Sequence, residues 1–272
     1  MHKGLEESAW QPKRLALLGL VALYMGGILI LPLWALMART IRAGFGSAWA
    51  ALLEPDALHG LLLTVILAVI AVVVNGVFGV VGALVLTRQS FRGRRFLDAL
   101  VDMPFAVSPV MVGLAFLLLF GREGWLAPLG WKVAFAFPGL VIATVFVTIP
   151  FTLREVAHVA EELGTSEEQA AITLGASRWQ TFRLVTLPNI RFGLGYGLML
   201  TTARALGEFG AVLVLGGAIS GLTQTATTYI FVAMDERREA GAYGMALVLA
   251  VISIVLLLIL ESMKRRRRRR GL

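Results

Sequence analysis

The sequence has no cysteine and only three histidines in 272 residues. The lack of cysteine excludes disulfides, thiolate metal sites and a cysteine nucleophile. His2, His59 and His158 are scattered without ligand spacing, so no metal site is expected. Charged residues are also scarce, at 15% of the chain, whereas hydrophobic residues make up 58%. This balance excludes an ordinary water-soluble domain and indicates a polytopic membrane protein.

Apolar runs long enough to cross a bilayer are the main feature that is present. They predict an all-α fold with six membrane-spanning helices, at about 15–38, 58–87, 99–120, 133–153, 192–217 and 243–261. The first run is too long for the apolar region of a cleaved signal peptide, and no small-residue cleavage site follows it. It is therefore expected to be retained as an anchor.

Basic residues fall mainly on one side of the predicted spans. Eighteen of the 25 lie inside if the N-terminus is cytoplasmic, which predicts that both termini are cytoplasmic. The six arginines Arg265 to Arg270 follow a span directly, and contact with anionic membrane lipids explains them better than a nucleic-acid arm does. The predicted organisation is a cytoplasmic tail at 1–14, a permease domain at 15–262 and a basic tail at 263–272. The permease domain includes a long cytoplasmic loop at 154–191.

The loop 154–191 is amphipathic and carries helix signals of its own. Ser166 and Gln169 have capping-box spacing, which predicts a short helix that begins at 166. Gly175 is expected to end that helix in a left-handed cap.

A second short helix is predicted in the same loop. Ser177 and Gln180 again have capping-box spacing, and Pro188 is expected to stop the helix. Two short helices one after the other have the outline of a helix-turn-helix. A loop that is tethered between two spans and has an acidic first helix does not suit DNA, so no nucleic-acid partner is expected. A loop that merely caps the bundle is the plainer alternative.

The loop segment QAAITLGASRWQTFRLVTLPNI resembles the cytoplasmic loop of ABC importer permeases. That family's pattern is Glu-Ala-Ala, three residues, Gly, and a Leu-Pro some twelve residues on. Here the pattern is held by Gln169, Ala170, Ala171, Gly175, Leu187 and Pro188. The resemblance implies that the first short helix docks on a separate ATPase and passes nucleotide-driven motion to the spans. Gln169 replaces the usual Glu, and Glu168 beside it is a candidate to supply the charge.

Two more segments, 102–125 and 201–225, resemble the membrane subunits of bacterial sulfate/thiosulfate importers. The first segment is most similar to the W-type subunit, and molybdate/tungstate permeases, which carry a segment similar to the second, are the alternative. The resemblance implies the type I ABC importer permease fold in a bacterial inner membrane. It also implies three kinds of partner: two ATPase subunits that use ATP and Mg, a T-type sister permease and a periplasmic sulfate-binding protein. The chain lacks a Gly-x-x-x-x-Gly-Lys-Ser/Thr motif, so it is expected to bind no nucleotide and to have no catalytic residues.

Arg204 and Glu208 lie inside the fifth predicted span, where a charged side chain costs roughly 2.5–3.5 kcal/mol. Residues four apart share a helix face and can pair. Two interpretations remain open. The pair lines the translocation pathway or its gate, or it is a buried latch between helices.

Ser108, Pro109 and Thr201 are further candidates for the translocation pathway. Hydroxyl groups, together with Arg204, are donors of the kind that a tetrahedral dianion needs. Pro104 and Pro109 are predicted to break the backbone hydrogen bonding of the third span, where a gate or vestibule could form, although kinked packing helices are as common.

Two other classes of membrane protein fit the sequence less well than a permease. An intramembrane enzyme needs a nucleophile and base, or paired carboxylates, at matching depth, and the sequence offers neither. A secondary transporter is disfavoured by the lack of an internal repeat. Glycines are expected to allow close helix packing at 76, 79 and 82, at 193 and 197, and at 217 and 221.

Overall fold

The computed structural model describes residues 3–269, and every regular element in that range is helical. The elements in chain order are α1 (Lys3–Ala43), α2 (Phe45–Leu52), α3 (Pro55–Arg88), α4 (Arg94–Ala106), α5 (Pro109–Phe120), η1 (Ala127–Leu129), α6 (Phe137–Leu163), α7 (Ser166–Thr173), α8 (Arg178–Thr181), η2 (Phe182–Thr186), α9 (Leu187–Leu206), α10 (Gly210–Gly216), α11 (Ala226–Asp235) and α12 (Glu239–Arg269). The side chains of the predicted tails at 1–14 and 263–272, including Arg265 to Arg270, lie outside the described residues.

Four unbroken helices of the described chain are long and apolar enough to cross a membrane: α1 from Ala16, α3, α6, and α12 as far as Ile259. Two bent helix pairs raise the number to six if each pair is one span. These are α4 with α5, bent by 112°, and the helix from Arg178 to Leu206 with α10, bent by 54°. The all-α fold of the prediction is confirmed, and the two bent pairs correspond to the predicted spans 99–120 and 192–217.

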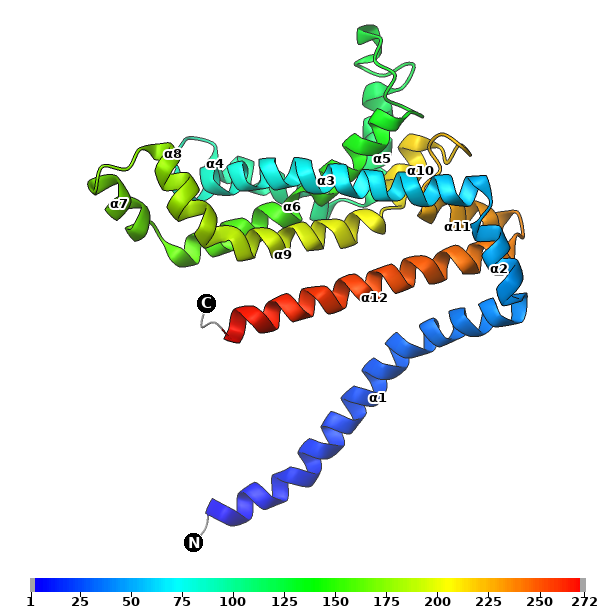
Figure 1. Ribbon diagram of the computed structural model, residues 1–272, viewed down its shortest axis with the longest axis horizontal. Helices are drawn as coiled ribbons and strands as arrows, with labels where there is room; N and C mark the ends of the chain where they lie inside the picture. The colour runs from blue at the N-terminus through cyan, green and yellow to red at the C-terminus, as the bar shows by residue number, and fades with distance from the viewer. Residues whose placement is uncertain (1–2, 270–272) are drawn as a thin grey trace.

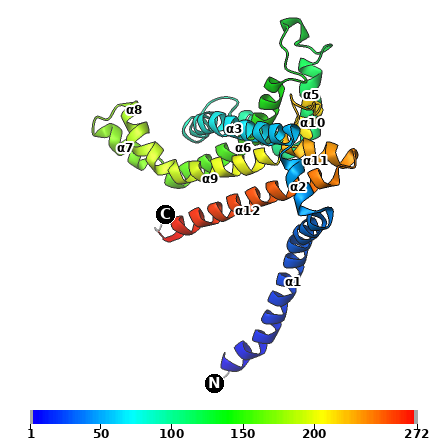
Figure 2. The ribbon, with the colours of Figure 1, turned by 45° about the vertical axis from the view of Figure 1, so that its right-hand side comes forward.

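Helices α3, α6 and α9 lie side by side and form the centre of the bundle (Figures 1 and 2). Small residues allow this close packing. A Cβ on Gly197 of α9 would lie 2.9 Å from the Cα of Thr152 on α6, and a Cβ on Gly79 of α3 would lie 2.9 Å from its Cγ2. The packing role predicted for the glycines of α3 and α9 is confirmed.

Gly217 and Gly221 lie in the turns that connect α10 to α11, and both have positive φ, +71° and +70°. L-residues with side chains rarely adopt this region. A Cβ on Gly217 would also lie 2.8 Å from Cδ1 of Phe135, whereas one on Gly221 would meet nothing within 4 Å, so the predicted packing role is wrong for Gly221.

Buried polar side chains hold the three central helices together. Asn75 of α3 donates from Nδ2 to Thr148 Oγ1 on α6 at 2.7 Å. Thr152 of α6 and Thr201 of α9 share a hydrogen bond of 2.8 Å between their hydroxyls. All four side chains are buried, and bonds of this kind join helices in a medium without water.

The third predicted span breaks at Val107 and Ser108, which are extended. Pro109 is at the start of α5, where its missing N–H leaves no helical bond unmade. Pro104 stays inside α4. The predicted break is therefore confirmed at Pro109 and wrong at Pro104, and α5 is directed away from the central helices (Figures 1 and 2).

One predicted boundary is wrong. Helix α6 continues to Leu163, so the loop predicted from 154 begins ten residues later. Val156 and Ala160 in this extension are buried in a cluster with residues of α3 and α9, which keeps it helical beyond the apolar run. The segment 218–242, between the fifth and sixth predicted spans, is not only a loop, because it contains α11, whose Tyr229 is buried.

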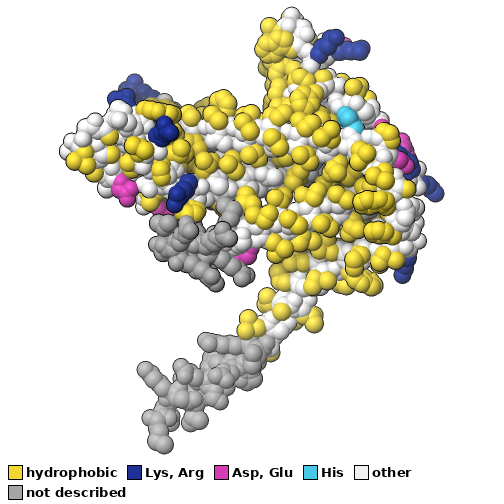
Figure 3. All heavy atoms as spheres, in the orientation of Figure 1, with side chains coloured by type: hydrophobic (Ala, Val, Ile, Leu, Met, Phe, Trp, Pro, Cys, Tyr) yellow, Lys and Arg dark blue, Asp and Glu magenta, His cyan; other side chains and the backbone are white. Residues whose placement is uncertain are grey.

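The C-terminal end of α1 packs against α12, and toward its N-terminus the helix diverges from the bundle (Figures 1 and 2). Its described side chains are almost all exposed. In Figure 3, hydrophobic side chains cover the middle of the molecule, whereas charged ones gather toward its ends and at the tip beyond α5. This distribution suits a bundle surrounded by lipid.

Candidate functional site

The first helix of the cytoplasmic loop, α7, ends in the predicted left-handed cap. Gly175 has φ +90°. Its N–H donates to the carbonyl of Ile172 at 2.9 Å, and the N–H of Ala176 donates to that of Ala171 at 3.0 Å. These two bonds form a Schellman motif, which satisfies the last carbonyls of the helix.

Helix α7 begins at Ser166, as predicted, but its cap differs from the predicted one. Its N-cap is Thr165 and not a residue of a capping box between Ser166 and Gln169. The Gln169 side chain donates instead to Thr165 Oγ1 at 3.1 Å. With Thr165 as the N-cap, N3 is Glu168, so Gln169 lies outside the N3 position that a capping box needs.

The second capping box is present. Gln180 accepts from the Ser177 N–H at 2.8 Å and donates its own N–H to Ser177 Oγ at 3.3 Å. Pro188 does not stop the helix that follows, because the π-helical segment η2 joins α8 to α9 and Pro188 lies in the first turn of α9. The wider π-helical turn gives the proline ring room and removes the bond that its missing N–H would have made.

The docking loop, defined here as residues 164–186, has an exposed apolar face. Leu174 is 88% exposed, Trp179 66% and Ile172 55%. Gln169 and Ala170 of the family motif are exposed beside them, whereas Leu187 packs against the core at the start of α9. Apolar side chains this exposed, beyond the ends of the spans, mark a surface for another protein.

Glu168 does not supply a free charge next to Gln169, as the sequence suggested. Its carboxylate forms an ion pair with Arg88 at the end of α3, 3.1 Å from Nε. The side chains of Arg88 and Glu168 are 17% and 19% exposed. The charge is therefore turned toward the spans.

The second candidate site, here called the pathway pocket, has a volume of about 430 Å3 and lies at the break between α4 and α5. It is lined by the whole segment from Pro104 to Pro109, by Val147 and Phe151 of α6, and by Arg204 of α9. The structure thus brings together Ser108, Pro109 and Arg204, which are separate candidates in the sequence. The α6 residues were missed, because nothing in a run of apolar residues distinguishes a lining face.

Arg204 and Glu208 form an ion pair of 2.6 Å between Nη1 and Oε2. The two side chains differ in burial, since Arg204 is 28% exposed and Glu208 only 2%. Glu208 also accepts the N–H of Ala211 in the first turn of α10 at 3.0 Å from Oε1. Glu208 therefore holds the bend between α9 and α10, and Arg204 is the member of the pair that reaches the pocket.

Thr201 lies apart from the pathway pocket. Its side chain is buried between α6 and α9, where its hydroxyl is bound to that of Thr152. The geometry makes it a packing residue.

Arg154 of α6 joins α4 to α6 one helical turn beyond Phe151. Its Nε donates to Asp102 Oδ1 at 2.7 Å and its Nη1 to Asp98 Oδ1 at 2.6 Å. Phe151 stacks edge-on against Phe105 with ring centroids 5.1 Å apart. The position of α4, and with it one wall of the pathway pocket, is thereby fixed on α6.

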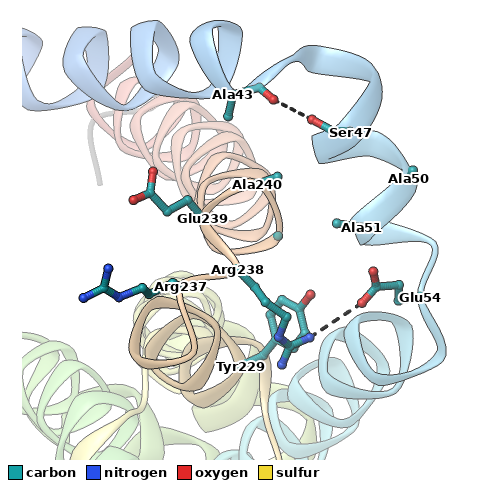
Figure 4. Close-up of a pocket in the computed structure, with 11 residues that line it drawn as sticks. Ala43, Ser47, Ala50, Ala51, Glu54, Tyr229, Arg237, Arg238, Glu239 and Ala240 are labelled. Atoms are coloured by element: carbon teal, nitrogen blue, oxygen red, sulfur yellow. Dashed lines mark hydrogen bonds and ion pairs between the residues drawn. The ribbon is translucent and has the colours of Figure 1, made fainter.

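A larger pocket, of about 600 Å3, lies between α2, α11 and α12, at the end of the bundle opposite the docking loop (Figure 4). Arg238 is stacked over the Tyr229 ring at 5.6 Å and pairs with Glu236 at 2.6 Å and Glu54 at 3.6 Å. Burial raises the pKa of the Tyr229 hydroxyl, and the charge of Glu54 adds to the shift. Arg237 and Glu239 point away from this cluster.

Comparisons with known proteins give a consistent result. The family model described as binding-protein-dependent transport system inner membrane component matches residues 75–269. The chain is 43% identical over 245 residues to the sulfate transport system permease protein CysW of Synechococcus elongatus, which covers 89% of this chain and 86% of that protein. It is 39% identical over 242 residues to the sulfate transport system permease protein CysT of Escherichia coli K12, with coverages of 88% and 87%.

A solved structure shares the fold. A bacterial ABC transporter involved in the import of the acidic polysaccharide alginate superposes with a TM-score of 0.78, covering 97% of this chain and 99% of that chain, at 17% identity. The helix order, the exposed docking loop and the matched family together define the class: this is a multi-pass permease component of an ABC transporter in an inner membrane. The chain belongs to the binding-protein-dependent transport inner membrane components, and within them to the sulfate transport system permeases. These relatives give no support to the molybdate/tungstate alternative.

Proposed function

We propose that the chain is the W-type permease subunit of an ATP-driven importer of sulfate and thiosulfate, and that it forms half of the translocation pathway. The observation that carries the proposal is the lining of the pathway pocket. Among the described residues that line it, Arg204 is the only charged side chain, and Ser108 adds a hydroxyl. A guanidinium has five N–H donors, so the bond to Glu208 leaves others for an oxyanion.

A T-type sister permease completes the pathway in this proposal. Support comes from Phe105 and Ser108, which line the pocket yet are exposed in the single chain. A pathway for a dianion has to be closed off from lipid, because a charge is costly in hydrocarbon. The matching half of the wall then comes from a second, related chain.

Two copies of an ATPase subunit, which use ATP and Mg, drive the cycle, one of them docked on Ile172, Leu174 and Trp179. The docking loop and both ends of the described chain lie at the same end of the molecule (Figure 1). We assign this end to the cytoplasm, in agreement with the excess of basic residues predicted there. A periplasmic sulfate-binding protein then docks at the opposite end, where Arg237 and Glu239 are exposed.

The test is uptake of labelled sulfate by bacterial cells that lack this chain. Restoring the chain should restore uptake, and unlabelled sulfate and thiosulfate should compete with the label, whereas equimolar molybdate should not. Failure to restore uptake, or stronger competition by molybdate than by sulfate, would overturn the proposed substrate.

A second measurement tests the need for an ATPase. The purified chain alone in vesicles should not concentrate sulfate, and the complex with its ATPase should do so only when ATP is present. Accumulation against a gradient by the chain alone would contradict the proposal.

A further inference from the structure

Glu168, in the first turn of α7, forms an ion pair with Arg88. Its Oε2 lies 3.1 Å from Arg88 Nε, and its Oε1 accepts a hydrogen bond from Arg88 Nη2 at 3.2 Å. A hydrogen bond between two charged groups is stronger than one between neutral groups. Because both side chains are more than four-fifths shielded from solvent, the pair differs from exposed surface ion pairs, which contribute little.

Arg88 is the last residue of α3, and its guanidinium also binds the end of α6. Nη1 donates to the carbonyl of Ala160 at 3.0 Å, and Nη2 donates to that of Gly164 at 2.7 Å. A cation at a helix C-terminus satisfies carbonyls that have no partner within the helix and interacts favourably with its dipole. One side chain thus joins α3, α6 and α7.

A third connection runs from α7 to the start of α9. The buried Thr186 donates from Oγ1 to Glu168 Oε1 at 3.0 Å. Asn189 donates from Nδ2 to Oε2 of the neighbouring Glu167 at 2.5 Å. The cavity among these residues is about 10 Å3, the lower limit for one water molecule, so the contacts are direct.

The backbone on either side of α7 is poorly suited to transmit force. Gly164 precedes the helix with φ +65°, and Gly175 follows it with φ +90°. A Cβ on either glycine would meet nothing within 4 Å. Glycine at such turns leaves the chain free to rotate unless side chains fix it.

We propose that Arg88 and Glu168 are positioning residues of the transport cycle, which make α7 move as one body with the ends of α3, α6 and α9. The inference rests on the proposed function, since it concerns motion supplied by a docked ATPase. Force on the exposed face of α7 then enters α3 and α6 through the carboxylate of Glu168, and reaches α9 through Glu168 and the neighbouring bond of Glu167 to Asn189. The glycine turns do not carry it.

The test uses the complete complex in vesicles and measures sulfate transported per ATP hydrolysed. Arg88→Ala and Glu168→Gln should each lower this ratio about five- to tenfold, the lower end of a typical coupling between two sites. Co-purification of the ATPase and its hydrolysis rate should persist, because Leu174 and Trp179 are unchanged. Arg88→Glu combined with Glu168→Arg should recover part of the ratio.

Arg183→Ala is the matched control, because Arg183 is an exposed arginine in the same loop. It should keep the parent ratio. If Arg88→Ala prevents assembly, Glu168→Gln decides, since it keeps the shape of the side chain. An unchanged ratio in the assembled Glu168→Gln complex would overturn the proposal.

A second readout uses the lack of cysteine in the chain. Spin labels at Ser90→Cys and Ser166→Cys report the separation between the end of α3 and the start of α7. The distance should be narrow and unchanged by ATP in the parent and should broaden in Glu168→Gln. A parent distance that changes on ATP binding would contradict the inference. A parent complex with this distance intact but without ATP-dependent sulfate uptake would contradict the proposed function instead.

Discussion

At the residue scale, Arg204 and Glu208 divide two tasks that the sequence could only assign to the pair. Glu208 is buried and holds the first turn of α10 through the N–H of Ala211. Arg204 neutralises that carboxylate and also lines the pathway pocket. Their spacing of four residues predicted the ion pair, whereas the difference in burial depends on packing around the bend and is not visible in the sequence.

The division of tasks makes stability and transport separable. Arg204→Ala leaves the Glu208 charge buried without its partner, a change that typically costs about 3–5 kcal/mol. The variant should have a lower unfolding temperature in detergent and little sulfate uptake. Adding Glu208→Gln, which removes the charge and can still accept the Ala211 N–H, should restore the unfolding temperature but not the uptake. Recovery of uptake in the double variant would show that the pair is only a latch.

At the scale of elements, glycine has two different functions, and each can be tested. At Gly175 it permits a backbone conformation, because a Cβ there would meet open space. At Gly197 it permits close approach, because a Cβ there would meet the backbone of α6. The sequence distinguishes these cases only by position, at the end or in the middle of a predicted helix.

Replacing Gly175 with Ile should uncouple transport and leave membrane insertion intact. A β-branched residue in the left-handed region is strained by roughly 1–2 kcal/mol, so the Schellman motif should open and the apolar face of the docking loop should change direction. Gly175→Asn is the matched control, because Asn tolerates this conformation. Sulfate uptake and the membrane-inserted fraction are the measurements, and full uptake by the Ile variant would count against the role of the loop.

Replacing Gly197 with Val should destabilise the bundle by about 1–3 kcal/mol, the usual cost of overpacking. The added side chain would push α9 away from Thr152 and stretch the hydrogen bond between Thr152 and Thr201. Gly19→Val in α1, where a Cβ meets nothing within 4 Å, is the control and should leave the unfolding temperature unchanged. Equal temperatures for both variants would contradict close packing at Gly197.

At the scale of the whole molecule, apolar runs were sufficient to predict the all-α fold, and the two prolines indicated the break in the third span, whereas the bend between α9 and α10 was missed. The extension of α6 to Leu163 was missed, because Glu155, His158 and Glu161 make that stretch polar on one side while its other side is buried. The pair of Arg88 and Glu168 was also missed, since 80 residues separate its members. Such contacts depend on how helices meet, which a single sequence does not reveal.

The packing of α1 and α2 against α12 also has a consequence for biogenesis. Both helices precede α12 in the chain, so they leave the ribosome before the helix that they mainly contact. A nascent chain therefore exposes the unpaired face of α2 until α12 has been synthesised.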